Sequence, residues 1–475
     1  MSAVAVRSTL LLALLPAVVA APVQAADWPT WGHDASRNMV SEETGLPDSF
    51  VPGTFKGDSD EIDLSTTKNV RWVAKLGSQS YGNPTVAGGR VFVGTNNEVP
   101  RDPKHKGDRG VMMCLDEKTG KLLWQLVVPK LGTGPASDWE LLGICSPPTV
   151  EGDRVYLVTN RCEVVCLDVN GLANGNDGPF VDEAQYMAGP GKPPIQPGPT
   201  DADILWRFDM RQELGVQPHN ITSSSILIAG NALAVNTSNG VNVNHTAVTN
   251  PKAPELILLD KATGKLLGRE ASGISARAFH GSWSSPALAK VGDQSTIVLG
   301  GPDGFCYGFD TQPVTPAAGP PTLKELWRCD CNPPSYRTKG GKPLKYKTPE
   351  GPSEVIATPV VSGGRIYATI GQDPEYGDGA GALVCINPSG AGNISRQGLV
   401  WSYTKISRSL STPSVADGLV YVGDYKGMVH CIDAATGKPL WVYDTKSRIW
   451  GSTLVADGKA YLGTEDGDLI ILQAG

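Results

Sequence analysis

The sequence has few charged residues and no excess of basic ones. Charged residues make up 19% of the chain, with 41 Lys and Arg against 48 Asp and Glu, which gives a formal net charge of −7. Nucleic acids and anionic lipid surfaces attract proteins through clusters of Lys and Arg. The composition therefore argues against nucleic acid or a membrane surface as a partner.

Motifs for covalent catalysis, haem attachment and zinc hydrolysis are also missing. The chain has nine cysteines but no Cys-x-x-Cys-His, so no c-type haem domain is expected. It contains no Ser-His-Asp arrangement and no zinc-binding helix motif. We therefore predict no catalytic residue and favour a non-enzymatic role.

Long apolar runs are missing beyond residue 25. The N-terminus has one basic residue, Arg7, then the run LLLALLPAVVA, and it ends in the small-x-small site 23–25. This pattern predicts a secretory signal peptide over residues 1–25, with a periplasmic or extracellular mature protein of net charge about −8. No Cys follows the cleavage site, so we do not expect a lipoprotein.

Turn-forming residues, by contrast, are abundant, and they recur within a repeated phrase. Gly (56) and Pro (37) together approach a fifth of the chain, which favours many turns over long helices. A short apolar stretch, a Gly-containing turn and an alternating β-branched or aromatic run follow one another seven times, at 83–94, 146–158, 223–235, 284–300, 357–369, 411–423 and 451–463. A long period with weak identity between copies is typical of a repeat architecture.

Each phrase predicts a β-hairpin, and the residues after it predict two more strands. The Asp-Gly or Gly-Gly pair suits a tight hairpin turn. A third strand then ends in CLDEKTGKLLW (114–124) or CIDAATGKPLW (431–441), in which Asp and Gly form a turn and Trp starts a fourth strand. We expect these Trp residues to pack between neighbouring units, so that truncating Trp441 costs about 3–5 kcal/mol.

Four antiparallel strands repeated seven times predict an all-β fold, a seven-bladed β-propeller over residues 69–475. Residues 26–68 are expected to be an N-terminal extension. The last unit lacks a fourth strand, and we expect 69–77, with Trp72, to supply it and close the ring. Eight blades are the alternative if 27–68 or 311–350 contains a degenerate unit. The Pro- and Gly-rich insertion 169–203 is predicted to be an extended, mobile loop.

Five of the nine cysteines fit the strand pattern and are expected to be buried core residues. Cys145, Cys162, Cys329 and Cys331 fall outside it. Export permits disulfides, but the pairing among these four stays open.

The Cys-x-Asp-x-x-x-Gly-x-x-x-Trp phrase and the N-terminal DWPTWGHDASRN (27–38) resemble those of the pyrroloquinoline-quinone (PQQ)-like propellers. That superfamily includes quinoprotein alcohol dehydrogenases and BamB outer-membrane assembly factors. The resemblance covers about residues 26–475 and implies the propeller fold. It implies much less about function, because such folds host many activities.

Candidate site residues come from three long loops and one blade connection. Loops 95–110, 236–254 and 371–381 are predicted on one face, and long loops on a rigid scaffold tend to carry binding sites. The predicted ligand-binding residues are Asn96, Asn97, His245, His280, Trp283, Asp373 and Glu375. Asp373, Glu375 and Asp378 are weak candidates for a hard cation, with a solvated acidic turn as the alternative; for His280 and Trp283 the alternative is blade packing.

These observations favour a secreted, non-catalytic binding or scaffold protein, monomeric, with an envelope protein or a polar ligand as partner. A role in envelope protein assembly follows from the BamB resemblance, and no cofactor is predicted in that case. The alternative is a PQQ- and calcium-dependent alcohol or sugar dehydrogenase. Those enzymes hold the quinone against an adjacent Cys-Cys disulfide, and the nearest approach here is Cys329-Asp-Cys331. A third alternative is a polysaccharide or peptide binder that uses an aromatic-lined mouth.

Overall fold

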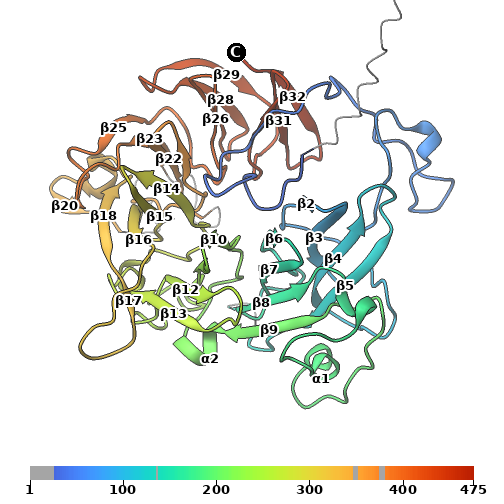
Figure 1. Cartoon of the computed structure of the whole chain (residues 1–475). Helices are drawn as coiled ribbons and strands as arrows, with labels where there is room; N and C mark the ends of the chain where they lie inside the picture. The colour runs from blue at the N-terminus through green and yellow to red at the C-terminus, as the bar shows by residue number, and fades with distance from the viewer. Residues whose placement is uncertain (1–25, 135–136, 346–350, 374–379) are drawn as a thin grey trace, which may run out of the picture.

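Among the described residues, seven β-sheets of four or five strands follow one another along the chain and stand around a common axis (Figure 1). The computed structural model describes residues 26–134, 137–345, 351–373 and 380–475; the predicted signal peptide lies outside them. We number the sheets 1 to 7 in chain order. In each sheet the first strand lies nearest the axis and the later strands follow outward, antiparallel to one another.

Sheets 1 and 2 contain four strands each, β2 (Thr85–Ala87), β3 (Arg90–Asn96), β4 (Arg109–Asp116) and β5 (Leu122–Pro129), then β6 (Thr149–Glu151), β7 (Arg154–Val158), β8 (Glu163–Asp168) and β9 (Ile204–Asp209). Sheet 3 contains β10 (Leu227–Ala229), β11 (Ala232–Asn236), β12 (Leu256–Asp260) and β13 (Leu266–Glu270), with the short β17 (Thr322–Leu323) added in parallel. Sheet 4 contains β14 (Ala287–Val291), β15 (Gln294–Gly300), β16 (Phe305–Asp310) and β18 (Glu325–Asp330), with β24 (Gly392–Asn393) added in parallel.

Sheets 5 and 6 are again four-stranded, β21 (Val360–Ser362), β22 (Arg365–Ile370), β23 (Ala382–Ile386) and β25 (Leu399–Tyr403), then β26 (Ser414–Ala416), β27 (Leu419–Gly423), β28 (Met428–Asp433) and β29 (Pro439–Asp444). Sheet 7 contains β30 (Leu454–Ala456), β31 (Lys459–Gly463) and β32 (Leu469–Gln473), with β1 (Val40–Ser41) parallel to β30. The remaining elements are short: β19 (Thr338–Lys339), β20 (Lys342–Pro343), α1 (Glu183–Ala188), α2 (Met210–Leu214), α3 (Pro334–Arg337), η1 (Leu64–Thr66), η2 (Gly171–Asn174) and η3 (Ser275–Arg277).

The hairpin turns have the backbone geometry that their sequences predict. A tight type I′ turn needs positive φ at both central residues. Gly88 and Gly89 have φ of 57° and 76°, and Asp417 and Gly418 have φ of 50° and 77°. The predicted hairpins therefore form where glycine, or aspartate before glycine, permits them.

The repeated Trp and Gly residues interlock neighbouring sheets. Trp206 of β9 lies against Gly264 of sheet 3, where an added Cβ would meet the indole at 2.4 Å, and its Nε1 donates to the carbonyl oxygen of Lys261. Trp401 repeats this arrangement with Gly437 and the carbonyl oxygen of Ala434. The repeated phrase thus has a structural purpose, which is to pack one sheet onto the next.

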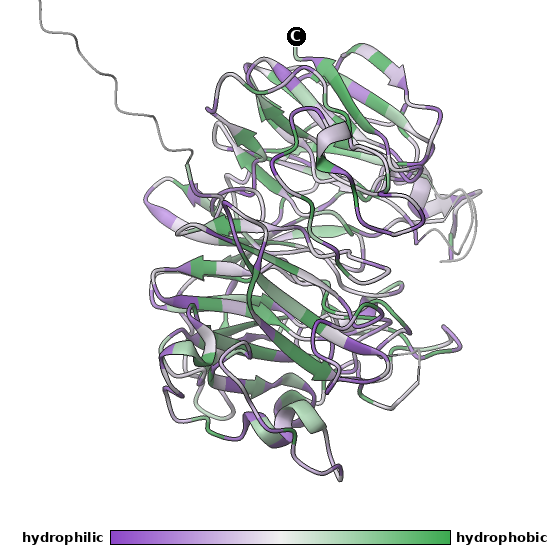
Figure 2. Cartoon of the chain, turned by 90° about the vertical axis from the view of Figure 1, so that its right-hand side faces the viewer, coloured by the Kyte–Doolittle hydropathy of each residue, from purple (hydrophilic) through white to green (hydrophobic). Residues whose placement is uncertain are grey.

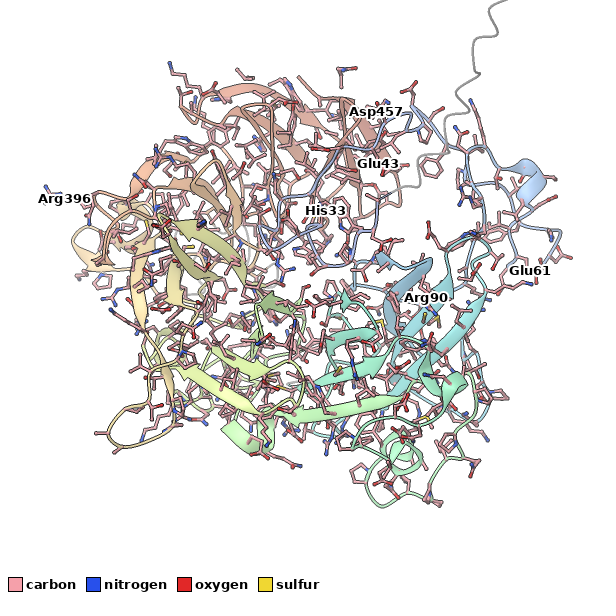
Figure 3. The ribbon with its side chains drawn as sticks, in the orientation of Figure 1. His33, Glu43, Glu61, Arg90, Arg396 and Asp457 are labelled. Atoms are coloured by element: carbon pink, nitrogen blue, oxygen red, sulfur yellow. The ribbon has the colours of Figure 1, made fainter. Side chains whose placement is uncertain are left out.

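An N-terminal segment, residues 28–41, contacts the inner edge of every sheet; we call it the N-terminal collar. In Figure 3 its His33 lies toward the middle of the ring, whereas Glu61 of the next segment lies at the periphery. Hydrogen bonds join the collar to the inner strands of six sheets through the pairs Trp28–Val86, Pro29–Val150, Ala35–Leu288, Ser36–Val361, Asn38–Val415 and Met39–Val455. Towards sheet 3, Arg37 bonds Ser225, two residues before β10. The collar therefore links all seven sheets at the axis.

Arg37 anchors the collar. Its side chain is fully buried, and its guanidinium donates to the carbonyl oxygens of Pro286, Trp31 and Ser225 and to Oγ1 of Thr30. Burial lowers the pKa of Arg37 to about 9, so the group stays charged at neutral pH.

The expected pairing of 69–77 with the last sheet is not confirmed. Residues 69–77 contain no strand, and β1 is the N-terminal strand that pairs with sheet 7. Trp72 nevertheless makes the same contacts as the other repeat Trp residues, since it lies against Gly120 and its Nε1 donates to the carbonyl oxygen of Glu117. The physical reason is that Trp72, Ala74 and Leu76 bury their alternating apolar face on sheet 1 without needing a strand partner.

The insertion 169–203 differs from its prediction as an extended, mobile loop. It contains η2 and α1, and it hydrogen-bonds β5 through Gln125, whose N–H donates to Thr200 and whose carbonyl oxygen accepts from Ala202. The helical turns bury Met187 and Ala188, which explains why the segment packs.

Figure 2 shows apolar residues along the strands and hydrophilic residues in the connecting loops. Among the described residues, no helix is long and apolar enough to cross a membrane.

Candidate functional site

A channel along the axis is lined by one residue from the connection before each inner strand. In every repeat this residue lies four positions before the first residue of the inner strand. The seven side chains are Tyr81, Cys145, Ser223, Trp283, Ile356, Leu410 and Trp450. All seven border both the deeper part of the channel, about 190 Å³, and its mouth, about 430 Å³. Trp31 of the collar also lines the deeper part of the channel.

Exposed aromatic side chains surround the mouth. Tyr81 is 55% exposed, and Trp139 and Trp450 are each 42% exposed. Trp139 comes from the connection between sheets 1 and 2, where its N–H donates to the carbonyl oxygen of Asn220. Large aromatic groups left exposed around a concave site are typical of binding surfaces.

Three histidines converge beside the mouth because backbone bridges hold their loops together. His219 precedes β10, His245 lies in the β11–β12 connection, and His280 follows η3. Isolated bridges pair 218 with 239 and 240 with 281. Gly240 permits the close approach, because a Cβ there would lie 2.7 Å from Cβ of His219 and from the carbonyl oxygen of His280.

The imidazoles face one another at short range. Nε2 of His245 lies 3.0 Å from Nε2 of His219, and the ring centroids of His219 and His280 are 4.2 Å apart. Nδ1 of His219 lies 2.8 Å from the carbonyl oxygen of Val241, which only accepts, so Nδ1 carries the proton. Burial, and secondarily the neighbouring His245, lowers the pKa of His219 to about 4. The ring is neutral at pH 7, and its Nε2 lone pair faces His245.

One carboxylate and one indole lie beside the histidines, and a buried carboxyl group lies near that carboxylate. Nδ1 of the buried His280 lies 3.7 Å from Oδ2 of Asp373, and Asp373 also lines the mouth. Glu354 is fully buried, and burial together with the nearby Asp373 raises its pKa well above the usual value. The ring of Trp283 lies edge-on to His280 at 5.1 Å, and its Nε1 points to the carbonyl oxygens of His219 and Ile221.

The structure brings together four of the predicted site residues: His245, His280, Trp283 and Asp373. Asn96 and Asn97 are buried and hold loops instead: Nδ2 of Asn96 donates to the carbonyl oxygen of Leu141, and Nδ2 of Asn97 donates to that of His105. Glu375 and Asp378 lie outside the described residues.

Sequence reasoning missed His219, Glu354 and most of the mouth. His219 lies in a blade connection, as His280 does, so the reasoning that selected His280 applies to it equally. The sequence reveals the residues of the mouth only when the repeats are aligned on the first residue of the inner strand. The residue four positions earlier is then compared between copies.

Comparison with known proteins agrees with this architecture. A family model described as outer membrane protein assembly factor BamB matches residues 57–171 and 379–475, together less than half of the chain. A 91-residue segment is 37% identical to 1-butanol dehydrogenase (cytochrome c) of Thauera butanivorans and covers 19% of this chain but 13% of that enzyme.

Two solved structures are also similar. BamB of Moraxella catarrhalis is 14% identical with a TM-score of 0.40, over 85% of this chain and 97% of that one. Quinohemoprotein alcohol dehydrogenase of Comamonas testosteroni is 15% identical with a TM-score of 0.48, over 92% and 76%. The family match over these two segments and the repeated four-stranded sheets make the chain similar to the PQQ-like repeat β-propellers.

The dehydrogenase branch implies PQQ and calcium, and the described residues do not fit them. The quinone carries several carboxylates, which favour Arg or Lys partners, yet the described residues that line the channel and mouth include neither. Calcium prefers six to eight oxygen ligands, whereas the donors gathered here are chiefly imidazole nitrogens. All nine cysteines are free, so the described chain offers no disulfide platform for the quinone.

Proposed function

We propose that the protein is an exported, non-catalytic propeller that binds a segment of a partner protein at the mouth of its axial channel, as a scaffold in envelope protein assembly. The observation that carries this proposal is the ring of exposed aromatic side chains around a mouth of about 430 Å³. Aromatic residues in a concave apolar site supply most of the energy in protein recognition.

The remaining features of the mouth fit a polypeptide ligand. Leu142, Ile356 and Leu410 offer apolar contacts, while Asn220 and Asp373 offer polar groups at the rim. An extended peptide presents both kinds of group, an apolar side chain that enters the channel and backbone amides that reach the rim. The predicted signal peptide and the BamB family match support an envelope location and a protein partner. The binding unit under this proposal is the monomer.

The test is a selection of displayed random peptides against the purified chain that begins at Ala26. Affinities of the selected peptides are then measured for the wild type, Trp139→Ala and Trp450→Ala. Phe55→Ala serves as a matched control, because Phe55 is 62% exposed but lies in the N-terminal extension, away from the mouth. We expect each mouth variant to bind about 30-fold more weakly, the effect of losing one hot-spot aromatic of about 2 kcal/mol.

Equal affinity for the wild type and both mouth variants would refute the proposal. A second assay addresses the alternative activity: PQQ, calcium, a primary alcohol and a redox dye are added to the same protein. Dye reduction that depends on PQQ, on calcium and on the alcohol would place the protein in the dehydrogenase branch instead.

A further inference from the structure

We propose that His219, His245 and His280 form a binding site for a divalent transition-metal ion of the zinc class. The nitrogen donors of the three side chains lie within 4.8 Å of one another, and they come from three separate segments of the chain. Imidazole is a preferred ligand of zinc, copper and nickel, and three imidazoles are a common protein contribution to a four-coordinate site.

The distances suit such an ion. Zinc–nitrogen bonds of about 2.0–2.1 Å in a tetrahedral site place two ligand nitrogens about 3.4 Å apart. The Nε2 atoms of His219 and His245 are 3.0 Å apart. The third imidazole, His280, has a donor nitrogen within 4.8 Å of the other two, so binding of an ion requires it to move closer to them.

His219 has the second contact that metal-binding histidines usually have. Its Nδ1–H donates to the carbonyl oxygen of Val241 at 2.8 Å, which fixes the tautomer and directs the Nε2 lone pair to the centre of the cluster. Residue 241 is held in turn by a backbone bridge to residue 248. The ligand orientation is therefore set by the loop that also carries His245.

The electrostatics beside the cluster favour a cation. Glu354 is fully buried, and neither of its carboxylate oxygens has a hydrogen-bond partner among the described residues. Its backbone pairs with that of Gly371, two residues before Asp373, and Oδ2 of Asp373 lies 3.7 Å from His280. The Asp373 carboxylate beside His280 would attract a cation bound by the three imidazoles.

A metal ion at this place would link the three segments that carry the histidines. It ties the β11–β12 connection to the blade connections that lead into sheets 3 and 4, directly behind the Trp283 wall of the mouth. We expect the ion to stabilise the chain by mass action, because it binds the folded form. This inference does not depend on the identity of the partner protein.

The test uses the chain from Ala26, purified without a polyhistidine tag and stripped with a chelator. Zinc binding is measured by titration calorimetry and by metal analysis after dialysis. The key variant is His245→Asn: His245 is only part-buried, and asparagine tolerates its positive φ of 52°, so the variant should fold. His33→Asn is the matched control, since His33 also has positive φ but lies in the collar.

We expect one zinc ion per chain for the wild type and His33→Asn, with a zinc-dependent rise in Tm. His245→Asn should bind about 100-fold more weakly or worse, because loss of even a residue that only supports a ligand costs about 10–100-fold in metal affinity. Calcium and magnesium should leave Tm unchanged. Cobalt should give the visible absorption of a four-coordinate site in the wild type and lose it in His245→Asn.

Two results would overturn the proposal. One is the absence of zinc binding by the folded wild-type chain at micromolar concentration. The other is equal zinc affinity in the wild type and His245→Asn. Neither result bears on peptide binding at the mouth, which is measured without added metal, so this proposal and the proposed function fail independently.

Discussion

At the scale of single residues, the same repeat position differs in burial from sheet to sheet. Trp124 is 1% exposed, packs on Phe92 and Gly171, and donates Nε1–H to the carbonyl oxygen of Val169. Trp441 is only part-buried, and its Nε1 donates to the carbonyl oxygen of Gly475. The sequence predicts the same large contribution to stability for each of these Trp residues, but in the structure their burial differs.

We therefore expect Trp124→Ala to lower the free energy of unfolding by about 3–5 kcal/mol and Trp441→Ala by about 1–2 kcal/mol. The reason is that truncating Trp124 leaves a cavity between two sheets, whereas water already reaches Trp441. Urea unfolding followed by circular dichroism measures both values. Equal costs for the two substitutions would contradict this expectation.

Glu255 gives a second prediction at the residue scale. The carboxyl group is fully buried, and Oγ of Ser275 donates to its Oε1 at 2.6 Å. Burial, together with the nearby Glu270 and Asp303, raises its pKa to about 8 from 4.5. The folded chain therefore keeps a proton on Glu255 over a pH range in which the unfolded chain has released it.

Stability should accordingly fall as the pH rises from about 4.5 to about 8, because the unfolded state binds fewer protons than the folded state across that range. Glu255→Gln, which stays neutral and can still accept from Ser275, should flatten this part of the Tm-against-pH curve. Glu61→Gln, a substitution at an exposed carboxylate, is the control and should leave the curve unchanged. A wild-type slope that persists in Glu255→Gln would assign the effect to another group.

At the scale of elements, local chemistry decides how much the sequence reveals. The hairpins could be predicted because Gly88-Gly89 and Asp417-Gly418 leave few alternatives to a tight turn. The Asp-to-Gly turns could be predicted for the same reason: Oδ1 of Asp433 accepts from N–H and Oγ1–H of Thr436, a contact within one turn. Such interactions involve neighbours in the chain, so the sequence alone defines them.

Contacts between distant segments could not be predicted in this way. The segment 69–77 alternates apolar and polar residues as a strand does, but its apolar side packs on sheet 1, and the pattern contains no information about its partner. His219 and His245 meet through bridges between separate loops. Asn96 and Asn97, which were predicted to bind ligand, are buried and bond backbone: Nδ2 of Asn96 donates to Leu141 of the next connection, and Nδ2 of Asn97 donates to His105 of its own loop.

At the scale of the whole molecule, the N-terminal collar is the one segment that contacts all seven sheets within the described residues. Among the described residues, consecutive sheets from 1 to 7 share hydrophobic clusters, so each sheet packs mainly on the next one along the chain, as repeats do in a solenoid. In the view of Figure 1, the last sheet and sheet 1 lie on either side of the N-terminal segment. The collar therefore adds hydrogen bonds at the axis to the pairwise contacts between consecutive sheets.

We expect loss of the collar's anchor to loosen every inner strand together. Arg37→Gln removes most of the hydrogen bonds of a fully buried guanidinium and leaves the carbonyl oxygens that it bonded without that donor. Hydrogen exchange measured by mass spectrometry should then show faster exchange at the amides that bond the collar, namely Val86, Val150, Leu288, Val361, Val415 and Val455. Asn38→Ala, which removes only the two bonds to Val415, is the milder variant if Arg37→Gln does not fold. If the collar stabilises all the inner strands together, its detachment must speed exchange in every sheet that it bonds. Faster exchange confined to the sheets next to the substituted residue would contradict this expectation and show that contacts between sheets are sufficient.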